Sequence, residues 1–104
     1  MSDVAFVTGA ASGLGAAMAR ALHGAGYRVA ITDVDGAGAQ ALAAELDGTG
    51  ETALGMALDV RDGAAIEAVA DAVARRWGGV QVLVNNAVLT RAVPVLDITL
   101  DDWD

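Results

Sequence analysis

A glycine-rich stretch near the start of the chain, Thr-Gly-Ala-Ala-Ser-Gly-Leu-Gly at residues 8–15, could bind phosphate. It follows a short apolar run and precedes a segment with apolar residues at the helical period. The first amides of a helix lack partners within the helix and lie at the positive end of its dipole, and glycine lets a ligand approach the backbone. The stretch therefore predicts a diphosphate site. The alternative is a tight turn in a chain that contains 13 glycines.

Asp33 is the second candidate for chemistry, because it directly follows another apolar run at residues 28–32. In dinucleotide-binding folds, an acid at this place accepts hydrogen bonds from both hydroxyl groups of the adenosine ribose, and its charge would repel a 2'-phosphate. No basic residue neighbours Asp33 in the sequence, which favours NAD over NADP. The alternative is that Asp33 and Asp35 cap the turn that follows.

The segments that must position these residues alternate between strand and helix patterns. Continuous apolar runs predict strands at residues 4–8, 28–32, 52–58 and 80–84. Asp35 and Asp62 are plausible caps of the second and third helices. Buried strands joined by helices imply an α/β fold with a parallel sheet covered on both faces. The apolar stripes of the three helices are Leu14, Ala17, Met18, Ala21, Leu22 and Ala25; Ala39, Leu42, Ala43 and Leu46; and Ile66, Val69, Ala70, Val73 and Trp77.

The composition fits one domain and excludes several kinds of site. A chain of 104 residues can bury roughly 60 to 70% of its unfolded surface. With no cysteine there can be no disulfide and no thiolate metal site, and one histidine leaves too few ligands for a histidine-based zinc site. We therefore expect no metal. His23 suits the end of the first helix, where a positive charge is favourable.

The charge argues against two further classes of partner. The formal net charge is -8, with six arginines and no lysine, whereas nucleic-acid binding needs clustered positive charge. No apolar stretch approaches the ~18 residues that a membrane span requires, and the first apolar run has no basic flank. We therefore expect a cytoplasmic protein that binds neither nucleic acid nor a membrane.

Taken together, four motifs resemble the short-chain dehydrogenase/reductase family. They are the spacing T-G-x-x-x-G-x-G at residues 8–15, the acid at Asp33, Asp59-Val60 after the third strand, and Asn85-Asn86-Ala87 after the fourth. The resemblance implies a Rossmann-like parallel sheet with strand order 3-2-1-4. It also implies an NAD-dependent oxidoreductase that transfers a hydride between nicotinamide and a small alcohol or ketone, and that assembles as a homo-oligomer.

The resemblance implies a role for each residue of the first two motifs. Asp33 matches the acid that binds the adenosine ribose, and Val34 would pack near the adenine. The backbone amide near Leu14 would donate to a phosphate. The residues that match the diphosphate loop are Gly9, Ser12, Gly13, Leu14 and Gly15.

The other two motifs are assigned in the same way. Asp59 matches the carboxylate that accepts a hydrogen bond from the adenine amino group, with the amide of Val60 beside it. Asn85 and Asn86 match the asparagines that tie the fourth strand to its neighbours and reach the ribose on the nicotinamide side. Ala87 would line that pocket.

The sequence departs from the family pattern at two places. Val88 stands where the family usually has glycine, and a β-branched residue would be strained there and crowd the nicotinamide half of the site. The family also uses an asparagine, a serine and a Tyr-x-x-x-Lys pair, in which the lysine lowers the pKa of the tyrosine. This chain has one tyrosine, Tyr27, and no lysine. We therefore predict no catalytic residue in it and no activity of the chain alone.

The last residues suggest where the chain stands within the family fold. Residues 96–104 resemble the start of the long fourth helix, and the sequence stops about one turn into it. We expect residues 1–104 to form an NAD-binding Rossmann half-domain, a truncated three-layer sandwich. An apolar patch beside the first and fourth strands and an unpaired edge at residues 80–84 would favour association. The alternative is a natural short module that binds a dinucleotide or assembles with another chain and catalyses nothing.

Overall fold

Strands and helices alternate along residues 3–86, the part of the chain that the computed structural model describes. Ala87, Val88 and residues 96–104 lie outside it, so the predictions for them stay predictions. The elements are β1 (Val4–Thr8), α1 (Gly13–Gly24), β2 (Arg28–Asp33), α2 (Gly36–Leu46), β3 (Ala53–Ala57), α3 (Gly63–Trp77) and β4 (Val82–Asn85).

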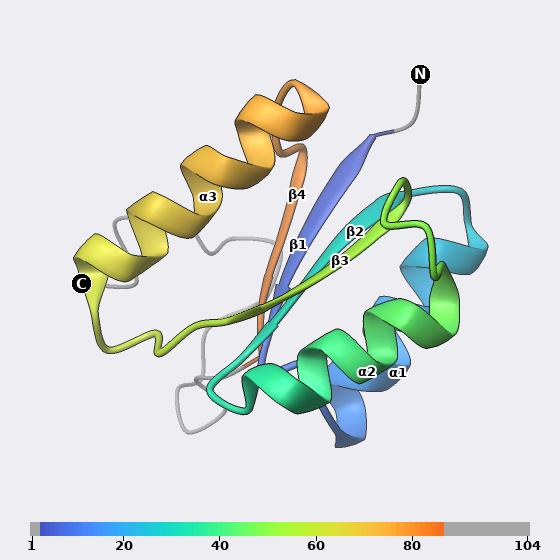
Figure 1. Cartoon of the computed structure of the whole chain (residues 1–104), viewed down its shortest axis with the longest axis horizontal. Coiled ribbons are helices and arrows are strands. Elements are labelled where there is room, and N and C mark those ends of the chain that lie inside the picture. The colour runs from blue at the N-terminus through green and yellow to red at the C-terminus, as the bar shows by residue number, and fades with distance from the viewer. Residues whose placement is uncertain (1–2, 87–104) are drawn as a thin grey trace.

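The four strands form one parallel sheet in the order β3-β2-β1-β4. Helices α1 and α2 lie on one face of the sheet and α3 lies on the other (Figure 1). The register pairs Thr8 with Asn85 and Val7 with Ile31, so the strands end at a common edge. This three-layer, Rossmann-like α/β arrangement confirms the predicted fold class and strand order.

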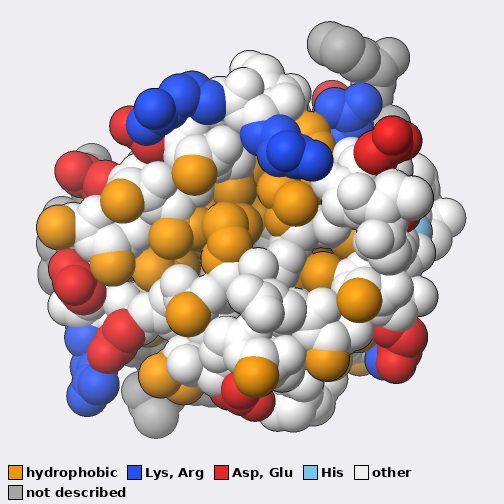
Figure 2. Space-filling model, viewed as in Figure 1, with side chains coloured by type: hydrophobic (Ala, Val, Ile, Leu, Met, Phe, Trp, Pro, Cys, Tyr) orange, Lys and Arg blue, Asp and Glu red, His pale blue; other side chains and the backbone are white. Residues whose placement is uncertain are grey.

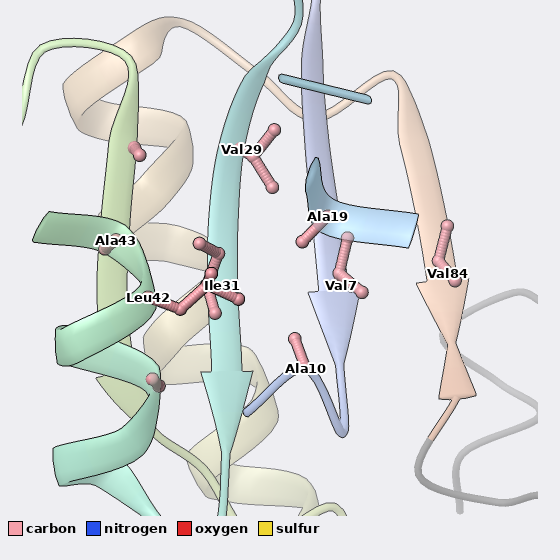
Figure 3. Close-up of a cluster of buried hydrophobic side chains, with 10 residues drawn as sticks. Val7, Ala10, Ala19, Val29, Ile31, Leu42, Ala43 and Val84 are labelled. Atoms are coloured by element: carbon pink, nitrogen blue, oxygen red, sulfur yellow. The ribbon is translucent and has the colours of Figure 1, made fainter. Parts of the chain in front are cut away.

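The core on the side of α1 and α2 is built from small and branched residues. Val7, Val29 and Ile31 project from the strands toward small side chains of the helices, including Ala19 and Ala43 (Figure 3). These five side chains are at most 5% exposed. Small residues at the contact allow the helices to lie close to the sheet, and interiors packed in this way leave few voids.

The core on the side of α3 holds Phe6 and Trp77. Val4 and Phe6 of β1 pack with Val73 and Trp77 of α3, and full burial of a side chain such as Phe6 contributes about 1.5–3 kcal/mol. Half-buried side chains surround this cluster, and Figure 2 shows hydrophobic groups gathered in the middle of the face where α3 and β3 lie. The contact with α3 buries β1 on this side.

Two expectations concern association with other chains. Within residues 3–86, the large hydrophobic side chains that are exposed are Leu14 and Val34, and neither lies on β1 or β4. Val82 and Leu83 of β4 are only half-buried, so the apolar patch expected beside the first and fourth strands stays a prediction. The fourth strand does lie at the edge of the described sheet.

Asp35 and Asp62 cap the N-termini of α2 and α3, as predicted. The carboxylate of Asp35 accepts a hydrogen bond from the amide of Gly38 at 3.0 Å, and Asp62 accepts from the amide of Ala65 at 3.1 Å. Each side chain satisfies one amide that has no partner within its helix. Helix α3 ends at Trp77, and Gly78, which follows it as the C-cap, has a φ of 90°, a left-handed conformation that favours glycine.

Two details differ from the sequence prediction. In the predicted apolar stripe of the first helix, Met18 and Leu22 are half-buried, but Leu14, Ala17, Ala21 and Ala25 are exposed. The buried positions of α1 are Gly15 and Ala19, because the smallest residues face the sheet where the helix approaches it closely. The fourth strand begins at Val82 rather than at residue 80. Gly78 and Gly79 have positive φ angles, so the chain is still turning when it reaches residue 80.

Candidate functional site

The predicted site residues come together at the carboxyl edge of the sheet. Gly9 follows β1, Asp33 is the last residue of β2, Asp59 comes two residues after β3, and Asn85 ends β4. Because all four strands are parallel, their carboxyl ends lie at the same edge, where ligands bind in open α/β sheets. The topology thus gathers residues that are far apart in the sequence.

The glycine turn leaves the start of α1 open. Gly9 and Gly13 both have a φ of 60°, and the side chain of Ser12 at the N-cap makes no capping hydrogen bond. The first hydrogen bond to the helix runs from the amide of Ala16 to the carbonyl of Ser12, and no acid lies in the first turn. The preceding helical amides are therefore available, and the positive end of the dipole has no counter-charge.

Gly15 holds this turn against the end of β4. A Cβ atom at position 15 would lie 2.0 Å from the carbonyl oxygen of Gly9 and 2.7 Å from Nδ2 of Asn86, so no other residue fits without displacing the backbone. Nδ2 of Asn86 donates a hydrogen bond to that same carbonyl oxygen at 3.1 Å. One residue earlier on each of the two segments, the hydroxyl of Thr8 donates to Oδ1 of Asn85 at 2.9 Å. The two asparagines tie β4 to β1, as predicted.

The carboxylate of Asp33 links the end of β2 to the glycine turn. Its Oδ2 accepts from the amide of Ala11 at 3.0 Å, and its Oδ1 accepts from the amide of Asp35 at 2.9 Å. Each carboxylate oxygen can accept two hydrogen bonds, so each oxygen retains capacity for one more donor. Asp33 is half-buried, with its charge at the edge of the site.

A cleft of about 350 Å³ opens between the ends of β2 and β3. Predicted and unpredicted residues share its lining: Gly9, Asp33, Val34, Leu58, Asp59, Val60 and Arg61. Five of these are predicted site residues, whereas Leu58 and Arg61 are not. The rest of the glycine turn and the two asparagines lie beside the cleft rather than in its wall.

Arg61 is the functional candidate that sequence reasoning missed. Its guanidinium Nη2 lies 2.8 Å from Oδ2 of Asp59, and its Nε lies 3.0 Å from Oδ1. The hydrogen bonds from the Arg61 side chain, followed by the one from its amide, lower the pKa of Asp59 from 3.8 to about 2. An arginine two residues after an acid at a strand end was the available signal. Arg61 and Asp33 both line the same cleft.

Leu14 and Val34 are exposed on either side of the site. Leu14 is 60% exposed at the start of α1, and Val34 is 76% exposed at the rim of the cleft. Single exposed apolar side chains are common on protein surfaces, so it is the position of these two residues, beside the glycine turn and the cleft, that makes them candidates for contact with a ligand.

A second, smaller cleft lies away from this edge. Tyr27, directly before β2, lines this cleft of about 240 Å³ at the opposite edge of the sheet.

Two other kinds of feature are absent from the described residues. Among residues 3–86, no group of three histidine, cysteine, aspartate or glutamate side chains could hold a metal ion. None of the helices in this part of the chain is long and apolar enough to cross a membrane.

Comparison with known proteins agrees with the fold. Residues 3–104 match the model of the short chain dehydrogenase family. The chain is 48% identical over 101 residues to D-threitol dehydrogenase of Mycolicibacterium smegmatis, and 42% identical over 100 residues to sorbitol dehydrogenase of Cereibacter sphaeroides. These matches cover 97% and 96% of this chain but 39% and 38% of the two relatives, so the chain spans about two fifths of their length.

Solved structures of dehydrogenases and reductases are also similar to this chain. Sorbitol-6-phosphate 2-dehydrogenase from Erwinia amylovora superimposes with a TM-score of 0.76 at 34% identity, over 94% of this chain and 39% of that one. A 3-ketoacyl-(acyl-carrier-protein) reductase from Brucella melitensis, complexed with NADH, gives a TM-score of 0.73 at 39% identity, over 79% and 32% of the two chains. The match to the family model over residues 3–104, together with these relatives and solved structures, shows that the chain belongs to the short-chain dehydrogenase family.

Proposed function

We propose that these 104 residues bind NAD as the cofactor-binding part of a dehydrogenase that transfers a hydride between nicotinamide and a small alcohol or ketone. The observation that carries the proposal is the cleft that joins Gly9 to the strand-end acids Asp33 and Asp59, next to the open start of α1. The dehydrogenase names of its relatives and the NADH bound to one structural neighbour support it.

The turn before α1 would hold the diphosphate. The amides at the start of the helix are free to donate, and the absence of an acid in the first turn suits an anion. The close packing at Gly15 supports this fit, because it brings the helix start against the backbone of Gly9. The residues that we assign to the diphosphate are Gly9, Ser12, Gly13, Leu14 and Gly15.

The cleft would hold the adenosine. Asp33 has acceptor capacity left on both oxygens, which suits the two hydroxyl groups of a ribose, and its charge disfavours a 2'-phosphate. Val34 would cover one side of the adenine. Asp59 would accept from the adenine amino group, beside the amide of Val60.

The nicotinamide side rests on fewer described residues. Asn85 and Asn86 would reach the second ribose from a position fixed by their bonds to Thr8 and Gly9, and Ala87 would line the pocket. Bound nicotinamide would supply the hydride acceptor or donor. The sequence contains no lysine and hence no Tyr-x-x-x-Lys pair, so we propose that these 104 residues do not turn over substrate by themselves.

Fluorescence titration of the chain with NADH and NADPH tests the cofactor assignment. We expect NADH to bind at least about tenfold more tightly, because a 2'-phosphate would meet the charge of Asp33. Tighter binding of NADPH would contradict the assignment. Robust oxidation of alcohols by the chain alone would contradict the proposed lack of turnover.

We also propose that the protein is cytoplasmic and that it assembles as a homo-oligomer. The assembly is supported by the edge position of β4, whose outer side pairs with no strand among residues 3–86. Sedimentation over a range of concentrations measures the assembly. A monomer that does not change on dilution or concentration would contradict it.

A further inference from the structure

Arg61 lines the proposed adenosine cleft together with Asp59. Its side chain makes three contacts with Asp59: Nη2 to Oδ2 at 2.8 Å, Nε to Oδ1 at 3.0 Å, and Nε to Oδ2 at 3.3 Å. The amide of Arg61 adds a fourth, to Oδ1 at 3.0 Å. The whole donor edge of the arginine is therefore directed at one carboxylate.

This pairing exceeds what the local turn requires. An aspartate that begins a turn needs only the backbone amide two residues later, which here is the bond to Oδ1. The side chain of Arg61 is 86% exposed, and an ion pair at such a place adds little to stability. Arg75 and Asp71, on α3, form a contrasting pair with a single contact of 3.8 Å. The paired Nε and Nη2 donors of Arg61 therefore hold the Asp59 carboxylate in one orientation and add little to the stability of the fold.

The hydrogen bonds also determine which oxygen of Asp59 remains available. Oδ1 already accepts from both the amide and Nε of Arg61, which fills its two acceptor positions. Nε carries a single hydrogen, which it shares between Oδ1 at 3.0 Å and Oδ2 at 3.3 Å. Oδ2 therefore has one full donor, Nη2, and only the longer branch of the shared one, so it has more acceptor capacity left than Oδ1. The available acceptor therefore belongs to a residue that lines the cleft.

We propose that Arg61 is a specificity-determining positioning residue, which holds the Asp59 carboxylate so that Oδ2 accepts from the amino group at position 6 of the purine. This inference rests on the proposed binding of NAD. A purine with an oxygen at position 6 presents an acceptor to an acceptor, and a buried or oriented polar group left without its partner costs affinity. The site should therefore prefer adenine to hypoxanthine.

The test compares NADH with reduced nicotinamide hypoxanthine dinucleotide, which differs only in the base. The ratio of the two dissociation constants is measured for the unchanged chain, Arg61→Met, Arg61→Lys and the control Arg75→Met. Both dinucleotides carry the same diphosphate and riboses, so loss of positive charge affects them equally and cancels in the ratio. Circular dichroism melting verifies that each variant is folded.

We expect the unchanged chain and Arg75→Met to prefer NADH to the same degree. In Arg61→Met the preference should fall roughly three- to tenfold, the change that corresponds to one hydrogen bond. Arg61→Lys should also lose preference, because lysine keeps the charge but lacks the planar fork.

Each other outcome overturns a distinct claim. If the unchanged chain binds neither dinucleotide, the proposed function is wrong. If it binds NADH but shows no preference between the bases, or if Arg61→Met keeps or increases the preference, the role of Arg61 is wrong. If Arg61→Lys keeps the full preference, orientation by the fork is wrong.

Discussion

The side-chain amide of Asn86 donates a hydrogen bond to the main-chain carbonyl of Gly9, although 77 residues separate them in the sequence. This bond fastens the glycine turn to the end of β4. It also places the start of α1 against the end of the neighbouring strand, since the same oxygen limits the space around Gly15. The proposed diphosphate loop is thus shaped by a residue outside it.

Asn86→Asp should therefore destabilise the fold and weaken binding of NADH. A carboxylate cannot donate to the carbonyl of Gly9, and a buried acceptor left without its donor costs about 1–3 kcal/mol. Urea unfolding and NADH titration measure the two effects. Gln81→Glu is the matched control, because Gln81 lies at the other end of β4 and only its oxygen is used, in a bond from the amide of Val4. Equal losses of stability and of NADH affinity in Asn86→Asp and Gln81→Glu would contradict the prediction.

Gly15→Ala should destabilise the chain by about 1–3 kcal/mol or more, as extra atoms in a packed site do. The new Cβ would lie 2.0 Å from a backbone oxygen, which cannot move as a flexible side chain could. Gly24→Ala, in the same helix, is the control. Its Cβ would meet no atom within 4 Å, so it should be neutral or stabilise by about 0.5–1 kcal/mol. Thermal melts compare the two, and similar melting temperatures would refute the packing argument.

Asp33→Asn should reduce NADH affinity about tenfold or more and narrow the preference over NADPH, since hydrogen bonds to a charged group are worth about 1.5–3 kcal/mol. Asparagine has one acceptor oxygen, whereas Asp33 accepts from both Ala11 and Asp35. Asp35→Asn is the control, because asparagine caps a helix as well as aspartate does. Fluorescence titration with NADH and NADPH measures the affinities of both variants. A larger loss of NADH affinity in Asp35→Asn would show that the wrong acid has been assigned to the ribose.

Asp47→Asn should lower stability at neutral pH and reduce the sensitivity of the fold to acid. Hydrogen bonds from the hydroxyls of Thr49 and Thr52, and then from their amides, hold the pKa of Asp47 well below its usual 3.8. Because the folded-state pKa is depressed, the stabilisation is present above the unfolded value and is lost as the pH falls through the folded value.

Urea midpoints at several pH values test this prediction about Asp47. The difference between the unchanged chain and Asp47→Asn should be largest above about pH 5 and should shrink as the pH falls further. Asp71→Asn removes the same charge from the exposed face of α3 and should match the unchanged chain. A constant difference at all pH values would rule out titration of Asp47 as the cause.

The sequence is sufficient to predict the order of strands and helices, two of the caps and the packing face of α3. These features depend on short-range signals: Asp62 lies directly before its helix, and Ile66, Val73 and Trp77 repeat at the helical period with polar residues between them. The predicted stripe of α3 is buried or half-buried throughout.

The face of α1 could not be predicted in this way. Small apolar residues occur all around this helix, so periodicity does not single out one side. The choice of Gly15 and Ala19 depends on how closely the helix can approach the sheet, which is a property of the folded chain. The expected stripe placed Ala17 and Ala21 inside, and both are exposed.

At the site, the sequence predicted the acids but not the partners of those acids. Asp33 was assigned either to a ligand or to its own turn, and its bond to the amide of Asp35 shows that it does support the turn. That bond leaves acceptor capacity free, so the two interpretations are compatible. Arg61 lies in the cleft because the turn after β3 brings it back over Asp59, a local backbone geometry that hydrophobic patterns do not encode.

The position of β1 between β2 and β4 has a consequence for synthesis on the ribosome. This apolar strand emerges before the other three, yet one of its two neighbours is the last strand in the described chain. Until β4 has been made, one edge of β1 has no native partner, and such unpaired strand edges promote association of incomplete chains. The nascent protein should therefore depend on chaperones until about residue 85 has left the exit tunnel, whereas α2 and β3 can dock on β2 well before that point.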